Sequence, residues 1–376
     1  MAAQEETRSR DVKGRFDVIV VGAGQAGLAI GHHLAQRGHR FTILEAAAEP
    51  GAAWRGRWDS LKLFTPVRYD ALPGLAFPGH PDSYPGRDEV ADYLADYADR
   101  FELPIEFNSR VRSIRRVENG YLVELEDRAY QADQVVVATG PFQVPNVPEI
   151  AKRLDPDVVQ FHSADYRSPE QAPHGPVLVV GGGNTGYQIA EELARSHEVH
   201  LSIGSRQLPL PQRVLGRDLF WLLETTGLMA KSKESRIGRR AQGRDTRVGS
   251  SPRTLRRRHG VQLHPRVVDT SGTEVTFSDG TRLAVSSVIW ATGFKLDFSW
   301  IDLPVFDERS QVVHQRGVTP APGFYFLGLT WQHTRGSALL GWVKDDAEYI
   351  AQQIDAFAGA KRSDDSDDSI KIAQNI

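Results

Sequence analysis

The chain has 376 residues, of which 40% are hydrophobic and 25% are charged, and its formal net charge is −3. This length predicts two or three domains, the composition is typical of a soluble globular protein, and the small net charge argues against a dedicated nucleic-acid binder. The chain contains no cysteine, which excludes disulfides, iron–sulfur clusters, thiolate metal sites and a Cys-x-x-Cys redox relay; no metal site is expected. There is no signal-peptide pattern and no apolar run near the roughly 20 residues that span a bilayer, so we expect a cytoplasmic protein without an integral membrane segment.

The first informative motif lies near the start of the chain, where residues 16–27 read FDVIVVGAGQAG. An apolar strand leads into a G-x-G-x-x-G turn at Gly22, Gly24 and Gly27, and a helical pattern follows. This is the sequence context of a dinucleotide-binding unit, in which the glycines let the backbone approach a pyrophosphate. The next predicted strand ends in Glu45, whose carboxylate can accept hydrogen bonds from ribose hydroxyls. The unit predicts a site for a dinucleotide with a free ribose; the alternative is that the glycines only let a helix pack close to a strand.

A second unit of the same kind occupies residues 177–186, which read VLVVGGGNTG. The following predicted strand, residues 199–203, does not end in an acid, and Ser205 and Arg206 come soon after it. A 2′-phosphate would be repelled by a carboxylate and held by an arginine, so this unit predicts a phosphorylated dinucleotide. FAD at the first unit and NADPH at the second are the simplest pair. Taken alone, Arg206 also fits a solvated surface arginine.

Each half of the chain also ends in the same local pattern. Alternating strands are followed by an apolar strand and the tripeptide Ala-Thr-Gly, at residues 134–140 and again at 287–293. The small turn would let backbone approach a bound cofactor, although two ordinary turn glycines would satisfy the pattern as well. A repeat of roughly 150 residues indicates two similar domains rather than a short-period solenoid. We therefore predict an α/β fold with two Rossmann-type, three-layer dinucleotide-binding domains.

The end of the chain predicts how these domains connect. Residues 324–329 form an apolar strand, 330–337 form a loop, and a helix is expected from near Ala338 to about Phe357. This strand–loop–helix has no partner sheet left in the NADPH half. It should therefore complete the first sheet and bring a helix N-terminus to the flavin.

We expect the FAD-binding domain to comprise residues 15–145 and 294–360, with the NADPH-binding domain, residues 146–293, inserted between them. Residues 1–14 and 361–376 are expected to be flexible tails, because their sequences are polar and charged. Residues 216–260 interrupt the second domain with a helical, basic excursion. This excursion is either a solvated face or a surface that recruits an anionic substrate or a membrane.

Residues 51–66 follow the first unit and read GAAWRGRWDSLKLFTP. They resemble the Gly-Gly-x-Trp segment of the class B flavin-dependent monooxygenases, a superfamily that includes the flavin-containing monooxygenases, the plant YUCCA enzymes and the Baeyer–Villiger enzymes. With both glycine motifs, both Ala-Thr-Gly turns and the closing Phe-Leu-Gly segment, the resemblance covers residues 16–357. It is nearest to the bacterial NADPH- and FAD-binding flavoproteins called CzcO-like. Residues 210–216, LPQRVLG, also resemble a YUCCA segment.

Two features depart from the superfamily pattern. In the signature F-x-G-x-x-x-H-x-x-x-[W/Y/F], His162 and an aromatic residue are kept, but Pro156 and Val158 stand at the Phe and Gly positions. The eukaryotic enzymes carry an active-site Asn shortly after the Gly-Gly-x-Trp segment, whereas residues 64–68 read FTPVR here. The sequence therefore leaves open the branch of the superfamily and whether oxygen is transferred at all.

The resemblance implies an NADPH-dependent flavoprotein monooxygenase. Hydride would pass from NADPH to FAD, and oxygen would pass from a flavin C4a-(hydro)peroxide to a small organic substrate, at a nitrogen or sulfur atom or a ketone. The partners would be this substrate and molecular oxygen, in a monomer or homodimer. An NADPH:acceptor oxidoreductase or NADPH oxidase without oxygen insertion is the alternative, and a flavin-bound sensor is a third. A disulfide reductase shares the architecture, but it needs cysteine.

No catalytic acid or base is predicted, because this chemistry needs the protein mainly for positioning and exclusion of water. By resemblance, Trp54, Lys62 and Tyr69 would line the flavin or substrate face, and Trp331, His333 and Arg335 would join them from the closing loop. The expected cofactor-binding residues are Gly22, Gly24, Gln25, Ala26, Gly27, Glu45, Trp54, Lys62, Val111, Ala138, Thr139, Gly140, Gly181, Gly183, Asn184, Thr185, Gly186, Ser205, Arg206, Ala291, Thr292, Gly293 and Gly328.

Overall fold

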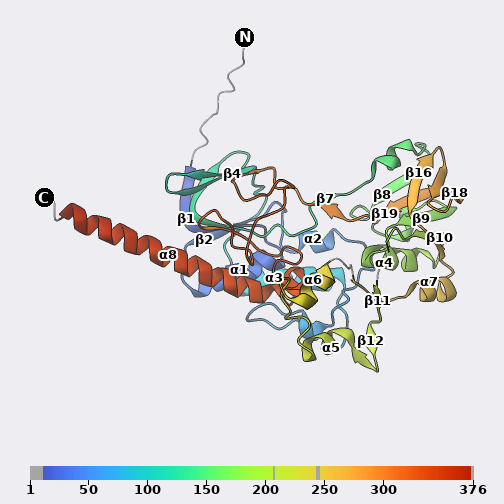
Figure 1. Cartoon of the computed structure of the whole chain (residues 1–376), viewed down its shortest axis with the longest axis horizontal. Helices are drawn as coiled ribbons and strands as arrows, with labels where there is room; N and C mark the ends of the chain where they lie inside the picture. The colour runs from blue at the N-terminus through green and yellow to red at the C-terminus, as the bar shows by residue number, and fades with distance from the viewer. Residues whose placement is uncertain (1–11, 206–207, 243–245, 374–376) are drawn as a thin grey trace, which may run out of the picture.

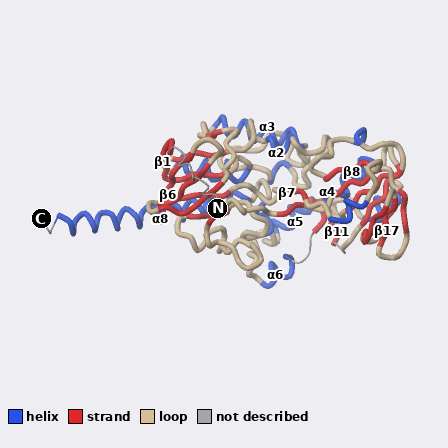
Figure 2. The backbone as a smooth tube through the Cα atoms, turned by 90° about the horizontal axis from the view of Figure 1, so that it is seen from above, coloured by secondary structure: helices blue, strands red, loops and turns tan. Residues whose placement is uncertain are grey.

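The computed structural model describes residues 12–205, 208–242 and 246–373. The molecule is elongated, with one large sheet in each half and β7 (Val144–Pro145) between them, as Figure 1 shows. Seen from above, the last helix, α8 (Val343–Ala373), projects from the first half and away from the second (Figure 2). None of the helices in these ranges is both long and apolar enough to cross a membrane.

The first half is built on an eight-stranded sheet. Its strands are β1 (Val12–Val21), β2 (Phe41–Leu44), β3 (Ile105–Glu106), β4 (Ser113–Val117), β5 (Gly120–Glu124), β6 (Ala129–Val137), β21 (Ile301–Asp302) and β22 (Phe324–Phe326). The order is β21-β4-β5-β6-β1-β2-β3, and β22 also pairs with β6. Strands β3, β2, β1, β6 and β22 are parallel, whereas β4, β5 and β6 form an antiparallel meander.

Both faces of the parallel strands are covered. Helices α1 (Gln25–Gln36), α3 (Arg87–Arg100) and α8 pack on one face, where their buried side chains belong to the same core as Val18 and Val20 of β1. Ile19 and Val21 belong to the core on the other face, under the meander. All four side chains are buried, because a parallel strand with a layer on each face is a continuous apolar run.

The second half carries a five-stranded parallel sheet in the order β15-β10-β9-β19-β8. The strands are β8 (Val159–His162), β9 (Pro176–Val180), β10 (Glu198–Ser202), β15 (Gln262–His264) and β19 (Ser287–Trp290). One face packs against α4 (Asn184–Leu193) and α7 (Pro252–Arg258). The other face packs against η2 (Glu149–Arg153) and the meander of β16 (Val267–Ser271), β17 (Glu274–Phe277) and β18 (Arg282–Ala284). The predicted α/β class with parallel strands is confirmed.

Two short strands link the halves: β7 pairs antiparallel with β20 (Phe294–Lys295). The chain leaves the first sheet after β6, builds the second sheet, and re-enters the first sheet through β21 and β22. A second domain inserted in the first requires this connectivity. The boundaries of the two domains stay a prediction. The short helices α2 (Ala52–Arg55) and η1 (Val67–Tyr69) belong to the first half, and η3 (Pro169–Gln171) belongs to the second.

The basic excursion, predicted as helical, contains strands as well as helices. Its elements before α7 are β11 (Leu208–Leu210), β12 (Arg213–Val214), β13 (Arg217–Asp218), α5 (Leu219–Thr225), α6 (Arg236–Gln242) and β14 (Thr246–Val248). Strands β12 and β13 form a hairpin, and β11 pairs with β14. The hairpin and α5 lie at the lower edge of the molecule in Figure 1, outside both sheets.

The prediction for the start of the chain needs correction. Strand β1 begins at Val12, inside the tail expected over residues 1–14. The reason is pairing with β6, in which Val12 and Gly14 lie opposite Ala129 and Tyr130.

The prediction for the last helix also needs correction. It begins at Val343, after the 3₁₀ turn η4 (Arg335–Ala338), rather than near Ala338. It continues past Phe357, so residues 361–373 are helical where a tail was expected. No proline interrupts this stretch, and Lys361 Nζ lies 3.0 Å from Asp133 Oδ1 of the first half.

Candidate functional site

The first glycine turn joins β1 to α1 and requires glycine at two of its three positions. Gly22 has a φ of +103°, and a Cβ there would lie 2.8 Å from the Ala138 carbonyl oxygen. A Cβ at Gly27 would lie 1.8 Å from the Gly22 oxygen. At Gly24, by contrast, a Cβ would meet nothing within 4 Å. Gly24 is the N-cap of α1 and no side chain caps the helix, so the first amides of α1 face open space where a phosphate fits.

The second turn, between β9 and α4, repeats this geometry. Gly181 has a φ of +132°, and a Cβ there would lie 2.1 Å from the Ala291 oxygen. A Cβ at Gly186 would lie 2.0 Å from the Gly181 oxygen, whereas one at Gly183 would meet nothing within 4 Å. Helix α4 also lacks a side-chain cap. Both turns therefore fit the pyrophosphate of a dinucleotide, and each packs on the alanine of an Ala-Thr-Gly turn.

Glu45 lies directly after β2, beside the first turn. Its two carboxylate oxygens accept hydrogen bonds from Ala23 N (2.7 Å) and Ala47 N (2.8 Å). These contacts hold the carboxylate at the carboxyl end of the strand, where a ribose would lie.

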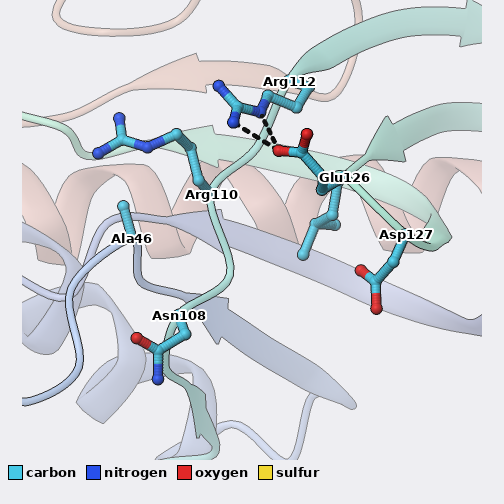
Figure 3. Close-up of a pocket in the computed structure, with 7 residues that line it drawn as sticks. Ala46, Asn108, Arg110, Arg112, Glu126 and Asp127 are labelled. Atoms are coloured by element: carbon cyan, nitrogen blue, oxygen red, sulfur yellow. Dashed lines mark hydrogen bonds and ion pairs between the residues drawn. The ribbon is translucent and has the colours of Figure 1, made fainter.

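A polar cavity of about 280 Å³ lies next to this strand end. It is lined by Ala46, Asn108, Arg110, Arg112, Leu125, Glu126 and Asp127. Figure 3 shows Ala46, Asn108 and Arg110 on one side and Arg112 paired with Glu126 on the other, with Arg112 Nε 2.9 Å from the carboxylate. Val111, predicted as a cofactor residue, is half-buried and packs against the core under the meander, and it is not among the residues that line the cavity. Sequence reasoning missed the lining residues, and a signal was available only for Asn108, Arg110 and Arg112, which follow the third parallel strand.

The corresponding place in the second half carries no acid. Strand β10 ends at Ser202, one residue before the predicted end, and Ile203 and Gly204 follow. Arg266 Nη2 donates a hydrogen bond to the Gly204 oxygen (3.0 Å), and a Cβ at Gly204 would come within 3.3 Å of Arg266 Nε. Ser205 is exposed, and Arg206 lies outside the described residues. Arg266, which the sequence analysis missed, is therefore a cation at this strand end.

The two Ala-Thr-Gly turns end at glycines with positive φ, Gly140 (+69°) and Gly293 (+81°). Thr139 Oγ1 accepts a hydrogen bond from Gln143 Nε2 (3.1 Å), and Thr292 Oγ1 donates to the Asn146 oxygen (2.5 Å). Both partners flank β7, so the turns are tied to the link between the halves.

The closing segment reaches the first turn. Gly328 has a φ of +84°, and a Cβ there would lie 2.9 Å from Ala26 Cβ. Gln25 Nε2 contacts the Ala338 oxygen at 3.5 Å. The structure thus brings the closing segment against Gln25 and Ala26 of the first turn. In the second turn, Asn184 is already used, because its side-chain oxygen accepts from Val248 N (2.9 Å).

The residues expected by resemblance lie at the junction of the halves. Trp54 is half-buried and packs against cores of both halves. The Lys62 side chain is exposed, and its backbone oxygen accepts a hydrogen bond from Gln188 of α4 (3.1 Å). Tyr69 stacks on Trp342, with ring centroids 5.7 Å apart.

Three segments that sequence reasoning could not position relative to one another converge here. Phe64 stacks on Phe220 at 5.9 Å, and Phe220 contacts Trp342 at 5.6 Å. Lys233 N donates to the His333 oxygen (2.7 Å). Segments 61–75 and 216–260 therefore meet the residues just before α8, where Phe64, Tyr69, Phe220 and Trp342 form one aromatic cluster.

Asp70 lies beside this cluster and is fully buried. Thr65 Oγ1 donates to Asp70 Oδ1 (2.6 Å), while Oδ2 has no partner among the residues that the structure describes. Burial raises the pKa of Asp70 to about 7. Sequence reasoning missed this residue, because nothing local marks an aspartate as buried.

Comparison with known proteins shows the family to which the chain belongs. Residues 19–211 match the family described as pyridine nucleotide-disulphide oxidoreductase. An uncharacterized CzcO-like oxidoreductase of Geobacillus kaustophilus is 44% identical over 340 residues, which is 90% of this chain and 98% of that protein. A probable indole-3-pyruvate monooxygenase of Arabidopsis thaliana, YUCCA9, is 28% identical over 94% of this chain and 92% of its own.

A solved structure agrees in fold over nearly the whole chain. The flavin-containing monooxygenase of Stenotrophomonas maltophilia has a TM-score of 0.77 and 31% identity, covering 92% of this chain and 99% of that one. These similarities confirm the resemblance drawn from residues 51–66 and the paired glycine turns.

Proposed function

Because the chain belongs to the pyridine nucleotide-disulphide oxidoreductase family and to the class B flavin monooxygenase superfamily, we propose that it is an FAD- and NADPH-dependent monooxygenase. The observation that carries the proposal is the pair of uncapped helix N-termini at Gly24 and Gly183, each with open space where a phosphate fits. Two dinucleotide sites in one chain suit a hydride transfer from one cofactor to the other.

The first site is proposed for FAD. The amides at the start of α1 would hold its pyrophosphate, and Glu45, oriented by Ala23 N and Ala47 N, would accept hydrogen bonds from its ribose. The polar cavity beside Ala46 and Asn108 would take the adenosine end. The closing segment at Gly328 would cover the first turn from the other side.

The second site is proposed for NADPH. The start of α4 would hold the pyrophosphate, and Arg206 together with Arg266 would hold the 2′-phosphate. The two sites and their parallel sheets support a Rossmann-type FAD domain with the NADPH domain inserted in it. Bound FAD would accept a hydride from NADPH and, once reduced, activate oxygen for transfer to a small organic substrate at a nitrogen, sulfur or ketone centre.

The residues of this chain would position the ligands and exclude water. The aromatic cluster of Phe64, Tyr69, Phe220 and Trp342 closes the junction between three segments, which suits a reaction that water would divert to hydrogen peroxide. The disulphide chemistry in the family's description has no counterpart here, because the chain has no cysteine. An NADPH oxidase or acceptor reductase is the second candidate, favoured by Pro156 and Val158 in place of the superfamily's Phe and Gly.

The test measures where the electrons go. Protein reconstituted with FAD is supplied with NADPH, oxygen and a panel of small sulfides, amines and ketones, and NADPH use, oxygenated product and hydrogen peroxide are quantified. Substrate-stimulated NADPH use with about one product per NADPH supports the monooxygenase. Peroxide in place of product with every substrate supports the oxidase, and absence of flavin reduction contradicts both.

A further inference from the structure

Arg57 is a half-buried arginine at the link between the two halves. It lies just after α2, and its guanidinium carbon is 5.3 Å from the ring centroid of Phe142 and 5.3 Å from that of Phe294. Phe142 precedes β7 and Phe294 begins β20. The guanidinium is thus packed against one ring from just before β7 and one from β20, which leaves its N–H edge as the part that can bind a ligand.

Arg57 has no anionic partner in the described part of the chain, and no hydrogen bond from its guanidinium is found there. Burial lowers its pKa, and the positive charge of Arg167 lowers it further. Its neighbour Arg55 differs, because Arg55 pairs with Glu49 at 3.2 Å and Asp92 at 2.8 Å. A cation withdrawn from water without a counter-charge is costly, so the position suits a ligand that brings a negative charge.

Arg167 supplies positive potential, and its guanidinium is partly engaged by the protein. Its Nη1 donates to the backbone oxygens of Ala164 (2.7 Å) and Tyr166 (3.1 Å). His162 is also engaged, with its Nε2 at 3.0 Å from the Gly293 oxygen. Arg57 differs from both, because its guanidinium donates no hydrogen bond to the described residues, whereas Arg167 and His162 each contact a backbone oxygen.

The location of Arg57 indicates which anion it meets. Phe294 directly follows Gly293, at the carboxyl end of β19, and β19 lies beside β9, which leads into the second glycine turn. Neighbouring strands are about 4.8 Å apart, and ligands of parallel sheets bind along this carboxyl edge. A coenzyme with its pyrophosphate at the start of α4 and its nicotinamide directed to the first half would cross this edge.

We propose that Arg57 binds the nicotinamide-side phosphate of the coenzyme held at the second glycine turn. This inference rests on the proposed function, since it requires a nicotinamide dinucleotide at that turn. The adenosine-side phosphate would be bound by the amides of α4, and Arg57, presented by the first half, would bind the other phosphate across the link. Binding of coenzyme would thereby hold the two halves in a fixed relation.

The experiment compares three variants of the FAD-loaded protein: Arg57→Met, Arg57→Lys and the control Arg55→Met. Dissociation constants are measured for NADP⁺ and for 2′,5′-ADP, which lacks the nicotinamide half. We expect Arg57→Met to weaken NADP⁺ by about tenfold or more and to leave 2′,5′-ADP unchanged. Arg57→Lys should retain part of the affinity, since the charge remains, and Arg55→Met should bind both ligands as the wild type does.

Two results would overturn the inference. Unchanged NADP⁺ affinity in Arg57→Met would show that Arg57 does not contact the coenzyme. Equal weakening of NADP⁺ and 2′,5′-ADP would show that Arg57 only maintains the second half. Failure of the proposed function is distinguishable from both, because the wild-type flavoprotein itself would then neither bind NADP⁺ nor be reduced by NADPH.

Discussion

The two halves place the same backbone around different side chains at the end of the second strand. Gly22 N donates to the Leu44 oxygen (2.8 Å) in the first half, and Gly181 N donates to the Ser202 oxygen (3.0 Å) in the second. The next residues, Glu45 and Ile203, therefore occupy equivalent places.

Their surroundings differ in one chemical respect. Ala23 N donates to the Glu45 carboxylate, whereas a Cβ on the equivalent Gly182 would lie 2.9 Å from Ile203 Cγ2. The apolar Ile203 leaves this strand end without an acid, and Arg266 adds a cation beside it. The comparison teaches that a common phosphate turn leaves ligand choice to the residues just after the strand.

The largest expected effect comes from filling either phosphate site. A Cβ at Gly24 or Gly183 meets no protein atom within 4 Å, so valine should be accepted by the fold while its side chain occupies the place of a phosphate. We expect Gly24→Val to lower FAD affinity by on the order of 100-fold or more, measured by flavin retention on purification. Gly183→Val should stay yellow but lose NADP⁺ binding. A Gly24→Val protein with full flavin content would contradict the assignment of the first site.

A carboxylate placed in the second half should reverse its ligand preference. Ile203→Glu would put an acid where Glu45 lies in the first half, where it would repel a 2′-phosphate and accept hydrogen bonds from a free ribose. We expect NADPH affinity to fall by about 10- to 150-fold, the range of a lost charged interaction of roughly 1.5–3 kcal/mol, while NADH affinity is kept or improved. Titration of the oxidised flavoprotein with each oxidised coenzyme checks this, and equal losses for both would refute it.

Removing a cation from the same strand end should have a smaller effect. Arg206→Ala and Arg266→Ala should each weaken NADPH by about tenfold, and NADH should be nearly unaffected because it lacks the phosphate. Arg282→Ala is a matched control, since Arg282 is an exposed arginine of the same half that faces Glu274 at 3.7 Å. Steady-state KM values for both coenzymes give the readout. If Arg266→Ala lowered affinity for NADH as much as for NADPH, Arg266 would be supporting the loop rather than binding the phosphate.

The sequence predicted the parts of this molecule that short-range geometry controls. Gly22 and Gly27 had to be glycine because neighbouring carbonyls leave no room for a Cβ, and Glu45 could be placed by counting from the strand. Ile203 was not recognised as its equivalent, because the predicted strand was one residue too long. Arg57 and Arg266 could not be found, since their roles depend on segments that meet only in the folded chain.

The end of the chain also depends on a contact that forms only in the folded protein. The charge run after Lys361 predicted a tail, because local composition does not reveal the ion pair with Asp133. The convergence of Phe64, Phe220 and Trp342 likewise joins three segments whose relative placement cannot be predicted from their spacing in the sequence.

The smallest expected effect on either cofactor comes from Asp70, which should act on stability alone. Its carboxyl is fully buried, and among the described residues Thr65 donates its one hydrogen bond. In the second half the buried carboxylate is Glu192, which accepts a hydrogen bond from Tyr166 (3.0 Å). An unfolded aspartate titrates near pH 4 (about 3.9), and burial raises the folded pKa of Asp70 to about 7. Between these values the folded state holds the proton more tightly than the unfolded state.

Stability should therefore fall as pH rises from about 4 to about 7, and the loss should be complete above pH 7. Asp70→Asn keeps a neutral side chain of the same shape, so it should match the wild type near pH 4 and exceed it at pH 8, by up to about 4 kcal/mol. Denaturant unfolding of both proteins at pH 5 and pH 8 measures the difference. Asp82→Asn, at an exposed carboxylate paired with Arg68, controls for removal of a charge. A constant stability difference between Asp70→Asn and wild type at the two pH values would show that the Asp70 carboxyl does not titrate between them in the folded protein.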